Sequence, residues 1–399
     1  MQAMTKSLYQ WMVSQPKYVN SFLNRFKLRA RMLVKGCVAI FSSKNMLDAP
    51  IECDILLIHP SYNSYKQGRK KQLINMLKEK GLIVEEFVEK KDKEKIVGRE
   101  FCKINDVPLL FKWEAYHAGY ILNKYQAKVI LTERNGWVLP SFIKKIRREG
   151  SIIMHMAHSI PTSQSSKYNY YDYDYYLIYG KSSYDYLRGL DGCFGSCQFV
   201  FAGPYFFYSD RKYKRNNKIE RNITFICSGP GYESNLPYIK LCAWIDRLVE
   251  ESVVDKLYVK CHPRGDNERW LKILDKYPDR VKFANDDELH DCLDDSQYAV
   301  MNYTNAIIDT TYYGIPIILL GETDDYFSVS DFSIPWARDY HELSKILKAK
   351  FVFSEKKFIS YHIENKQGAS QFLVDFVYSI TNEEKNVLNE VKGVLVGDF

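Results

Sequence analysis

Short apolar runs alternate with helix-length segments in the second half of the chain, and this pattern predicts parallel strands. The runs begin at Ile223, Leu257, Tyr298 and Ile317, and a helix is expected over Ala306–Tyr313. Continuous apolar runs are typical of strands that are buried on both faces of a parallel sheet. Ligands of such sheets lie beyond the carboxyl ends of the strands. The second half is therefore predicted to be a doubly wound α/β domain with a ligand site at that edge.

The first half repeats this alternation and predicts a second α/β domain. Its expected strands are Cys53–Pro60, Leu82–Val88, Ala127–Thr132, Ser151–Met156, Tyr175–Tyr179 and Phe199–Phe201, and its expected helices are Lys70–Lys80, Trp113–Lys124 and Pro140–Glu149. The loop after the first strand has no GxGxxG, which excludes a dinucleotide fingerprint there. The charged run Lys90–Lys95 is interpreted as a solvated turn, and Asp172 and Asp174 as surface positions.

The length of 399 residues exceeds one ordinary domain. We expect a basic helical segment (1–47), a first Rossmann-like domain (48–208), a basic linker (209–222), a second Rossmann-like domain (223–354) and C-terminal helices (355–399) that pack back across the cleft. The last of these helices is expected at Glu383–Leu395.

Composition places the chain among globular proteins, since 46% of its residues are hydrophobic and 26% are charged. The nine cysteines form no CxxC pair, which disfavours a zinc site. No HExxH motif and no DxD-type carboxylate pair stands at a strand end, so neither a required metal nor another cofactor is expected, and the thiols are expected to be reduced. Residues 1–20 hold no signal-peptide core, and no run of about 18 apolar residues occurs. A cytoplasmic location is therefore expected. Nucleic acid is disfavoured as a partner, because the cations are not interleaved with a motif that reads RNA or DNA.

The segment Phe22–Phe41 mixes large apolar residues with five cations and no acid. Such a helix suits the surface of an anionic membrane, which would place the protein on the inner face of the cell membrane. The alternative is a helix that packs on the body of the protein with its cations in solvent.

Polar groups suited to an anion follow three strands of the second half. They are Ser228 and Gly229; Lys260, His262, Pro263 and Arg264; and Tyr303, Thr304, Asn305 and Asp309. Small residues allow close backbone approach, cations form charge-assisted bonds, and the free amides at a helix start bind anions. Three such strand ends predict a nucleotide or phosphate site. The alternatives are a solvated basic turn around His262 and simple helix capping by Thr304 or Asn305.

Two candidates for a general base follow strands of the first half, namely Glu133 and His158. A carboxylate or an imidazole at this position can take the proton of an acceptor hydroxyl. The alternatives are an ion pair of Glu133 with Arg134 or Arg147, and a loop-ordering role for His158. His155 is expected to point to the opposite face and to be structural.

With these motifs the chain resembles bacterial GT-B glycosyltransferases that build surface polysaccharides, above all the groups that use cytidine-activated donors. His262-Pro263 is similar to the HP element of bacterial sialyltransferases and polysialyltransferases, which contacts the CMP phosphate. KCHPR followed by NYTNAIIDTTYYGIPII looks like the CDP-glycerol glycerophosphotransferases, and AHSIPT is similar to their HGTP segment. Glu133 with Asn135-Gly136 resembles the acidic motif of bacterial sialyltransferases. The chain departs from these groups at Arg134, where a second acid is usual, and at Thr304-Asn305, where a Ser-Ser pair is usual.

The resemblance implies an α/β GT-B fold, in which two Rossmann-like domains face each other across a cleft and the C-terminal one holds the donor. It implies that His262 and Thr304 bind the donor phosphate, that Asp309 supports that loop or the ribose, and that Glu133 is the base. The implied activity is metal-independent transfer of a sugar, with a CMP-sugar favoured, to a glycan or lipid-linked acceptor in capsule or lipopolysaccharide synthesis. The alternatives are a CDP-glycerol- or ribitol-type phosphate transferase, a sugar-nucleotide epimerase and a non-catalytic glycan-assembly protein.

Overall fold

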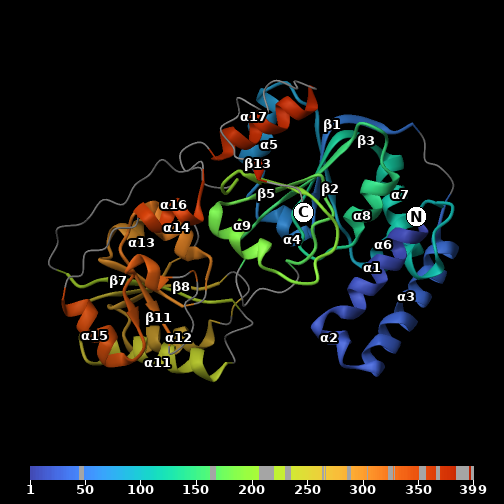
Figure 1. Cartoon of the computed structure of the whole chain (residues 1–399). Helices are drawn as coiled ribbons and strands as arrows, with labels where there is room; N and C mark the ends of the chain where they lie inside the picture. Colours follow the sequence, from blue (N-terminus) through green and yellow to red (C-terminus); the bar gives the residue numbers. More distant parts are fainter. Residues whose placement is uncertain are drawn as a thin grey trace. The chain divides into compact units, whose positions relative to one another are not determined.

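The computed structural model divides the chain into two compact units (Figure 1). The first unit comprises Met1–Tyr208 and Ile363–Phe399, and the second comprises Ser209–His362. The structure describes residues 1–44, 49–161, 168–205, 220–229, 235–262, 265, 267–284, 289–302, 304–321, 327, 329–349, 356–364, 369–382 and 395–396. Across these residues, no helix has the length and apolar character needed to cross a membrane.

A seven-stranded sheet forms the centre of the first unit, in the order β13-β6-β5-β4-β3-β1-β2. The strands are β1 (Ile51–His59), β2 (Val84–Val88), β3 (Tyr125–Thr132), β4 (Ile152–Met156), β5 (Tyr175–Ile178), β6 (Gln198–Phe201) and β13 (Leu395–Val396). All neighbours pair in parallel except β13, which is antiparallel to β6. The predicted strands of the first half are therefore confirmed.

The first unit also contains helices around this sheet (Figure 1). They are α1 (Gln2–Ser14), α2 (Pro16–Val19), α3 (Phe22–Ser42), α4 (Tyr62–Lys66), α5 (Lys71–Glu79), α6 (Asp92–Val97), η1 (Leu109–Phe111), α7 (Lys112–Lys124), α8 (Leu139–Ile146), α9 (Lys181–Arg188) and α17 (Ala369–Thr381). Alternate residues of a strand point to opposite faces. Ile55 and Leu57 of β1 accordingly share a core with Leu73 of α5 and with Val374 and Phe376 of α17.

The helix α17 brings the end of the chain back to the first unit. Its residues Leu373 and Val377 are buried in the same core as α5, and Ser370 Oγ donates to the Tyr205 carbonyl at 3.2 Å. Of the expected helix Glu383–Leu395, residues 383–394 lie outside the described part of the chain, and Leu395 belongs to β13. The expected linker lies outside it as far as residue 219.

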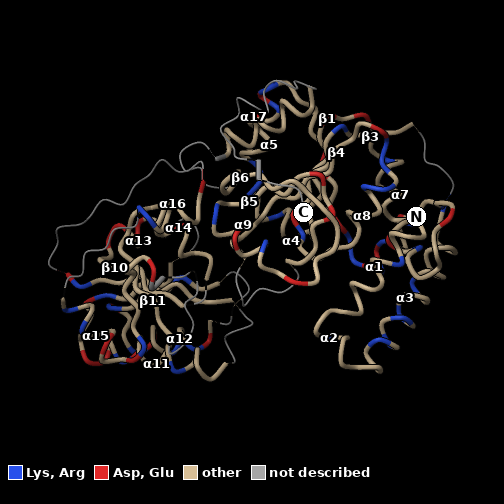
Figure 2. The backbone as a smooth tube through the Cα atoms, viewed as in Figure 1, with Lys and Arg blue, Asp and Glu red and all other residues tan. Residues whose placement is uncertain are grey.

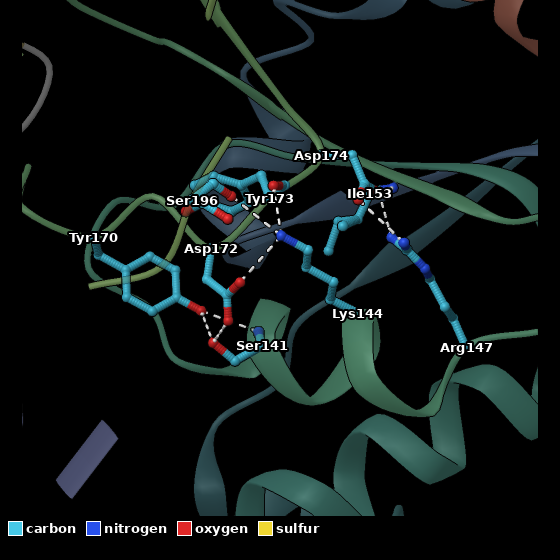
Figure 3. A network of polar contacts seen from close by, with 9 residues as sticks. All are labelled: Ser141, Lys144, Arg147, Ile153, Tyr170, Asp172, Tyr173, Asp174 and Ser196. Atoms are coloured by element: carbon cyan, nitrogen blue, oxygen red, sulfur yellow. Dashed lines mark hydrogen bonds and ion pairs between the residues drawn. The ribbon is translucent and has the colours of Figure 1, made fainter. Parts of the chain in front are cut away.

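A network of ion pairs fastens α8 to the tyrosine-rich loop that precedes β5 (Figure 3). Arg147 pairs with Asp174, and Lys144 Nζ lies 3.2 Å from Asp172 Oδ1. Ser141 Oγ donates to Asp172 Oδ2 at 2.5 Å. The expectation that Asp172 and Asp174 are surface positions was wrong, because both carboxylates serve as partly buried partners of α8.

The expected turn at Lys90–Lys95 was also wrong, because these charges form a packed structure. Helix α6 begins at Asp92, and its Lys95 is buried in an ion pair with the buried Glu89. His117 Nε2 of α7 lies 2.9 Å from the other oxygen of Glu89. Part of this charged run therefore forms a helix, because its buried charge is paired with groups outside that helix.

The second unit has a six-stranded parallel sheet in the order β12-β11-β10-β7-β8-β9. The strands are β7 (Ile223–Ile226), β8 (Leu257–Lys260), β9 (Val281–Phe283), β10 (Tyr298–Met301), β11 (Ile317–Leu320) and β12 (Trp336–Ala337). The helices are α11 (Leu236–Glu250), α12 (Glu268–Lys276), α13 (Leu289–Asp294), α14 (Ala306–Tyr313), η2 (Val329–Phe332), α15 (Tyr340–Lys348) and α16 (Lys356–His362). Residues of α11, α12 and α15 share one core with the sheet. The predicted α/β class is thus confirmed for both units.

Candidate functional site

The carboxyl edge of the first sheet holds a buried carboxylate, Glu133, directly after β3. Lys70 Nζ lies 2.8 Å from Glu133 Oε2, and both side chains are buried. Ser64 Oγ donates to Glu133 Oε1 at 2.6 Å, and the Tyr205 hydroxyl donates to Oε2 at 2.9 Å. The sequence missed these three partners because each lies 63 to 72 positions away from Glu133 along the chain. One of the two alternative ion-pair partners considered for Glu133 was wrong, because Arg147 pairs with Asp174.

These contacts fix the charge of Glu133. Burial raises the pKa of the carboxyl, but the Lys70 charge and the hydrogen bonds from Lys70, Ser64 and Tyr205 outweigh burial and hold the pKa below 4.5. The carboxylate is therefore ionised at neutral pH and has both oxygens engaged. Such a group is a weak base, and its geometry suits the positioning of neighbouring loops.

His158 follows β4, the strand next to β3, and its side chain is exposed. Although part of the residue is open to solvent, the protein packed around the ring lowers the pKa of His158. Arg69 and Lys70 add to this effect, and the Glu133 carboxylate and backbone oppose it. The ring is therefore neutral at pH 7 and can accept a proton. Between the two predicted bases, His158 has the more suitable exposure and protonation state.

Two other histidines at this edge are buried. His155 Nε2 lies 2.8 Å from Asn135 Oδ1, and its ring stacks on Tyr173 at 4.6 Å. Burial lowers the pKa of His155 to about 3, so it is a neutral packing residue, as the sequence indicated. His59 ends β1, and its Nε2 lies 2.7 Å from Glu86 Oε2. His59 was not predicted as a candidate site residue, because the apolar residues before it indicated only a buried strand.

An exposed tyrosine pair lies on α4, the short helix that follows β1. Tyr62 and Tyr65 are 59% and 43% exposed, and their rings stack with centroids 6.2 Å apart. Ser64, between them in sequence, is the residue that donates to Glu133. The first unit thus presents aromatic faces beside its buried ion pair.

In the second unit, the predicted phosphate-binding residues follow three neighbouring strands. β7 lies between β8 and β10, and Ile226 of β7 is in register with Lys260 and Met301. Parallel strands in register end at the same edge, so Ser228, His262 and Thr304 all follow that edge.

Gly229 and His262 lie against each other at this edge. A Cβ atom built on Gly229 would lie 3.5 Å from His262 Nε2 and Cδ2. Ser228 is fully buried, its amide donates to the Tyr238 hydroxyl at 3.1 Å, and its Oγ has no hydrogen-bond partner within the described chain. Lys260 Nζ donates to the Cys261 carbonyl at 3.1 Å, so this cation lies over the end of its own strand.

Helix α14 begins at this edge with Asn305 in the N-cap position. The backbone amide of Ala306 donates to Thr304 Oγ1 at 3.3 Å, so Thr304 supplies a hydrogen bond to the first turn. Asp309 lies one turn into the helix with an exposed side chain. The helix ends at Tyr313, as the sequence predicted, and Gly314 follows it with a φ of 99°.

Three predicted site residues, Pro263, Arg264 and Tyr303, lie outside the described residues. A cavity of about 80 Å³ lies under the strand ends, lined by Cys227, Tyr238, Ile239, Cys242, Cys261, Arg269 and Trp270. It is smaller than the roughly 300–1,000 Å³ that a bound small molecule usually occupies. Across the described residues, no group of three or more His, Cys, Asp or Glu side chains is arranged to hold a metal ion.

Solved structures share this architecture. MnaA of S. aureus, solved as a co-structure with UDP, matches with a TM-score of 0.52 and 12% identity over 83% of this chain and 97% of its own. The UDP-GlcNAc 2-epimerase of Neisseria meningitidis, bound to UDP-GlcNAc, gives 0.52 and 9% over 82% and 100%. The UDP-GlcNAc 2-epimerase of Methanocaldococcus jannaschii gives 0.50 and 10% over 82% and 100%. No protein-family model and no curated protein matches the chain.

At these identities the shared property is the fold. The chain has the GT-B class of α/β architecture, with two Rossmann-like units and additional N-terminal helices. Fold alone does not decide function, which has to be argued from the two carboxyl edges.

Proposed function

We propose that this protein is a glycosyltransferase that moves a sugar from a nucleotide donor to a glycan or lipid-linked acceptor in bacterial surface-glycan synthesis. The observation that carries the proposal is the edge of the second sheet, where Gly229 lies against His262 and a buried Ser228 hydroxyl lacks a partner within the described chain. Helix α14 starts at the same edge. A glycine gives a phosphate room to approach the backbone, and an imidazole and helix amides stabilise its charge.

The first unit supplies the proton acceptor in this proposal. His158, which is exposed and neutral, takes the proton of the acceptor hydroxyl. The hydroxyl oxygen bonds to the anomeric carbon as the bond between that carbon and the nucleotide phosphate breaks. Glu133 orients the edge through Lys70 and Ser64. The exposed faces of Tyr62 and Tyr65 suit the apolar face of a sugar ring, which supports a glycan acceptor.

A polyol-phosphate transferase is the second candidate, and the exposed imidazole favours it. In the sequence comparison His158 lies in the segment AHSIPT, which is similar to the HGTP segment of CDP-glycerol transferases. In that reaction the same base would act, but the hydroxyl would attack phosphorus and the nucleoside monophosphate would leave.

The nucleotide is tested first. The motif around His262 favours cytidine donors, and the solved structures that share the fold contain UDP or UDP-GlcNAc. A thermal-shift panel of CMP, CDP, UDP, GDP and dTDP covers both. A nucleotide at 100 times its dissociation constant should add about 2.7 kcal/mol to the free energy of unfolding. A protein that none of the five stabilises would be a non-catalytic assembly protein or would have another substrate.

The reaction is tested second, with the donor sugar of the nucleotide that binds. Glycosyl transfer releases the nucleotide and glycosylates an added glycan. Polyol-phosphate transfer leaves a phosphodiester in the product. Conversion of UDP-GlcNAc into its epimer without an acceptor would replace the proposal by an epimerase, the third alternative.

A further inference from the structure

Helix α3 packs on the first unit through one narrow face. Met32, Gly36 and Ala39 are its buried residues, and a Cβ atom on Gly36 would lie 2.0 Å from the Leu109 carbonyl oxygen. Lys35 Nζ adds an ion pair with Asp92 at 2.6 Å. The helix is thus fixed to the protein body, and the remaining faces of the helix point away from that contact.

A second, apolar face of α3 is exposed. Its residues are Phe22 (79% exposed), Leu23 (57%), Phe26 (61%), Leu33 (38%), Val34 (64%) and Phe41 (84%). At about 100° per residue they fall within an arc of roughly 120°, which the small residues Ala30 and Cys37 complete. The buried face lies outside this arc. An apolar stripe of this width normally covers a hydrophobic partner.

Cations border the stripe on both sides. Lys27 and Arg31 follow one border on the helical projection, and Arg25 and Arg29 follow the other. Residues 1–47 contain eight Lys or Arg and no Asp or Glu. The positive positions along α3 are blue in Figure 2, and α2 with the adjoining end of α3 projects from the body of the unit in Figure 1.

We propose that this stripe binds the surface of an anionic lipid membrane, with α3 lying in the plane of the interface. The large apolar side chains would enter the boundary between head groups and acyl chains, and the bordering cations would meet the anionic head groups. A nucleic acid would satisfy the cations but leave the apolar stripe in water. This inference goes beyond the proposed function, because it holds whichever group the protein transfers.

Residues of α3 serve both the packing of the first unit and the exposed stripe, so a test has to separate the two. Deletion of residues 1–47 would also remove the packing contacts of Met32, Gly36 and Ala39. Substitutions on the exposed face separate the two roles. Phe22→Gln with Phe26→Gln removes apolar area and keeps every charge, and Leu236→Gln, at 75% exposure on α11, is the matched control.

The full-length protein is sedimented with vesicles of phosphatidylglycerol and, separately, of phosphatidylcholine. We expect binding to the anionic vesicles alone, weakening as salt is added. The double Phe variant should bind at least tenfold more weakly with an unchanged melting temperature, and the Leu236 variant should bind as the unmodified protein does. Arg29→Gln with Arg31→Gln should weaken binding by roughly fivefold for each charge and reduce the salt dependence.

Three results would overturn the proposal. The first is equal binding to both kinds of vesicle, which would remove the role of charge. The second is unchanged vesicle binding by a folded double Phe variant. The third is a protein that binds neither kind of vesicle but forms a dimer, and whose dimer dissociates when both Phe residues are replaced. That result would mean that the stripe binds a second copy of the chain.

Discussion

A single carboxylate contacts residues from three other segments at the carboxyl edge of the first sheet. Glu133 follows β3, Ser64 lies in α4, Lys70 precedes α5, and Tyr205 follows β6. Removing one partner of a buried ion pair leaves an uncompensated charge, which costs more than the pair itself contributes. The geometry of this edge therefore depends on Lys70 as much as on Glu133.

We expect Lys70→Met to destabilise the protein by about 3–5 kcal/mol at pH 7, because it leaves the buried Glu133 carboxylate without its cation. Chemical denaturation measures this loss. Lys71→Met, at the exposed neighbouring position, is the control and should change stability little. Equal stability of the two variants would mean that the Lys70–Glu133 pair contributes nothing.

The same pair predicts a pH dependence. Because the pKa of Glu133 is below 4.5 in the folded protein, the unfolded chain binds more protons here on the acid side. The contribution is complete above about pH 4.5 and is lost as the pH falls through the folded pKa. The decrease in melting temperature on acidification should therefore be smaller in Lys70→Met than in the unmodified protein.

His158→Ala should reduce turnover about 10²- to 10⁴-fold while nucleotide affinity is unchanged. Because the pKa of His158 is lowered below 6.5, kcat/KM should stay level above that pH and fall only on the acid side. His341→Ala, on α15, is the control. If Glu133→Gln instead removes turnover with a normal fold, and His158→Ala is silent, Glu133 is the base after all.

His262→Ala should weaken nucleotide binding by about 1.5–3 kcal/mol, the value of one hydrogen bond to a charged group. Isothermal titration with the nucleotide that the thermal-shift panel selects measures the change. His341→Ala again serves as the control in the same unit. Unchanged affinity in a folded His262 variant would remove this residue from the site.

Residues at strand ends were predictable from the sequence, but their partners were not. Glu133 and His262 follow recognisable apolar runs, so their place at a carboxyl edge could be derived. Lys70 lies 63 positions from Glu133, and only the order of β1 beside β3 brings them together. Periodicity along the chain carries no information about that order.

Whole elements followed the hydrophobic pattern closely. Helix α14 has the predicted bounds Ala306–Tyr313, and β7, β8, β10 and β11 begin at the predicted residues. The pattern failed at α6, where buried ion pairs replace apolar contacts. It also gave two alternatives for the basic N-terminal helix, and the structure shows that α3 packs by one face and exposes another.

The packing of α3 predicts an unusual response at Gly36. Alanine normally stabilises a helix relative to glycine by about 0.5–1 kcal/mol. At Gly36 the added methyl would meet the Leu109 backbone, so we expect a net loss of about 1–3 kcal/mol from overpacking. The free energy of unfolding measures this loss.

Gly189→Ala is the matched control for Gly36. Its added Cβ lies 3.6 Å from the nearest backbone oxygens, an ordinary contact, and Gly189 has a negative φ. A Gly36→Ala variant that is as stable as Gly189→Ala would show that α3 is not held against Leu109.

At the scale of the whole molecule, the chain builds the first unit from both of its ends. The second unit is continuous from Ser209 to His362, whereas the first needs α17. We expect a fragment of residues 209–362 to unfold cooperatively and to bind the nucleotide of the full chain. A fragment of residues 1–208 should be insoluble or unfolded, because the core face of α5 lacks its cover.

Adding residues 363–399 as a separate peptide should partly restore the first fragment. Circular dichroism and thermal denaturation distinguish the two fragments. A stable, soluble fragment 1–208 would contradict this account of α17. The sequence led us to expect that the C-terminal helices pack back on the protein. The face on which α17 packs could not be predicted without the order of the strands. That the two units face each other across a cleft stays a prediction.

Because the first unit is built from both ends of the chain, its parts are synthesised at different times. When Tyr208 leaves the ribosome, the strands of the first unit are complete except for β13, but the helix that covers α5 has not yet been made. At roughly 5–20 residues per second, the stretch up to α17 takes on the order of ten to thirty seconds. Throughout that interval a nascent chain displays an uncovered apolar surface while the second unit is free to fold. Slow translation of the second unit would prolong this exposure, so chaperone dependence should rise when codons between residues 209 and 362 are made rare.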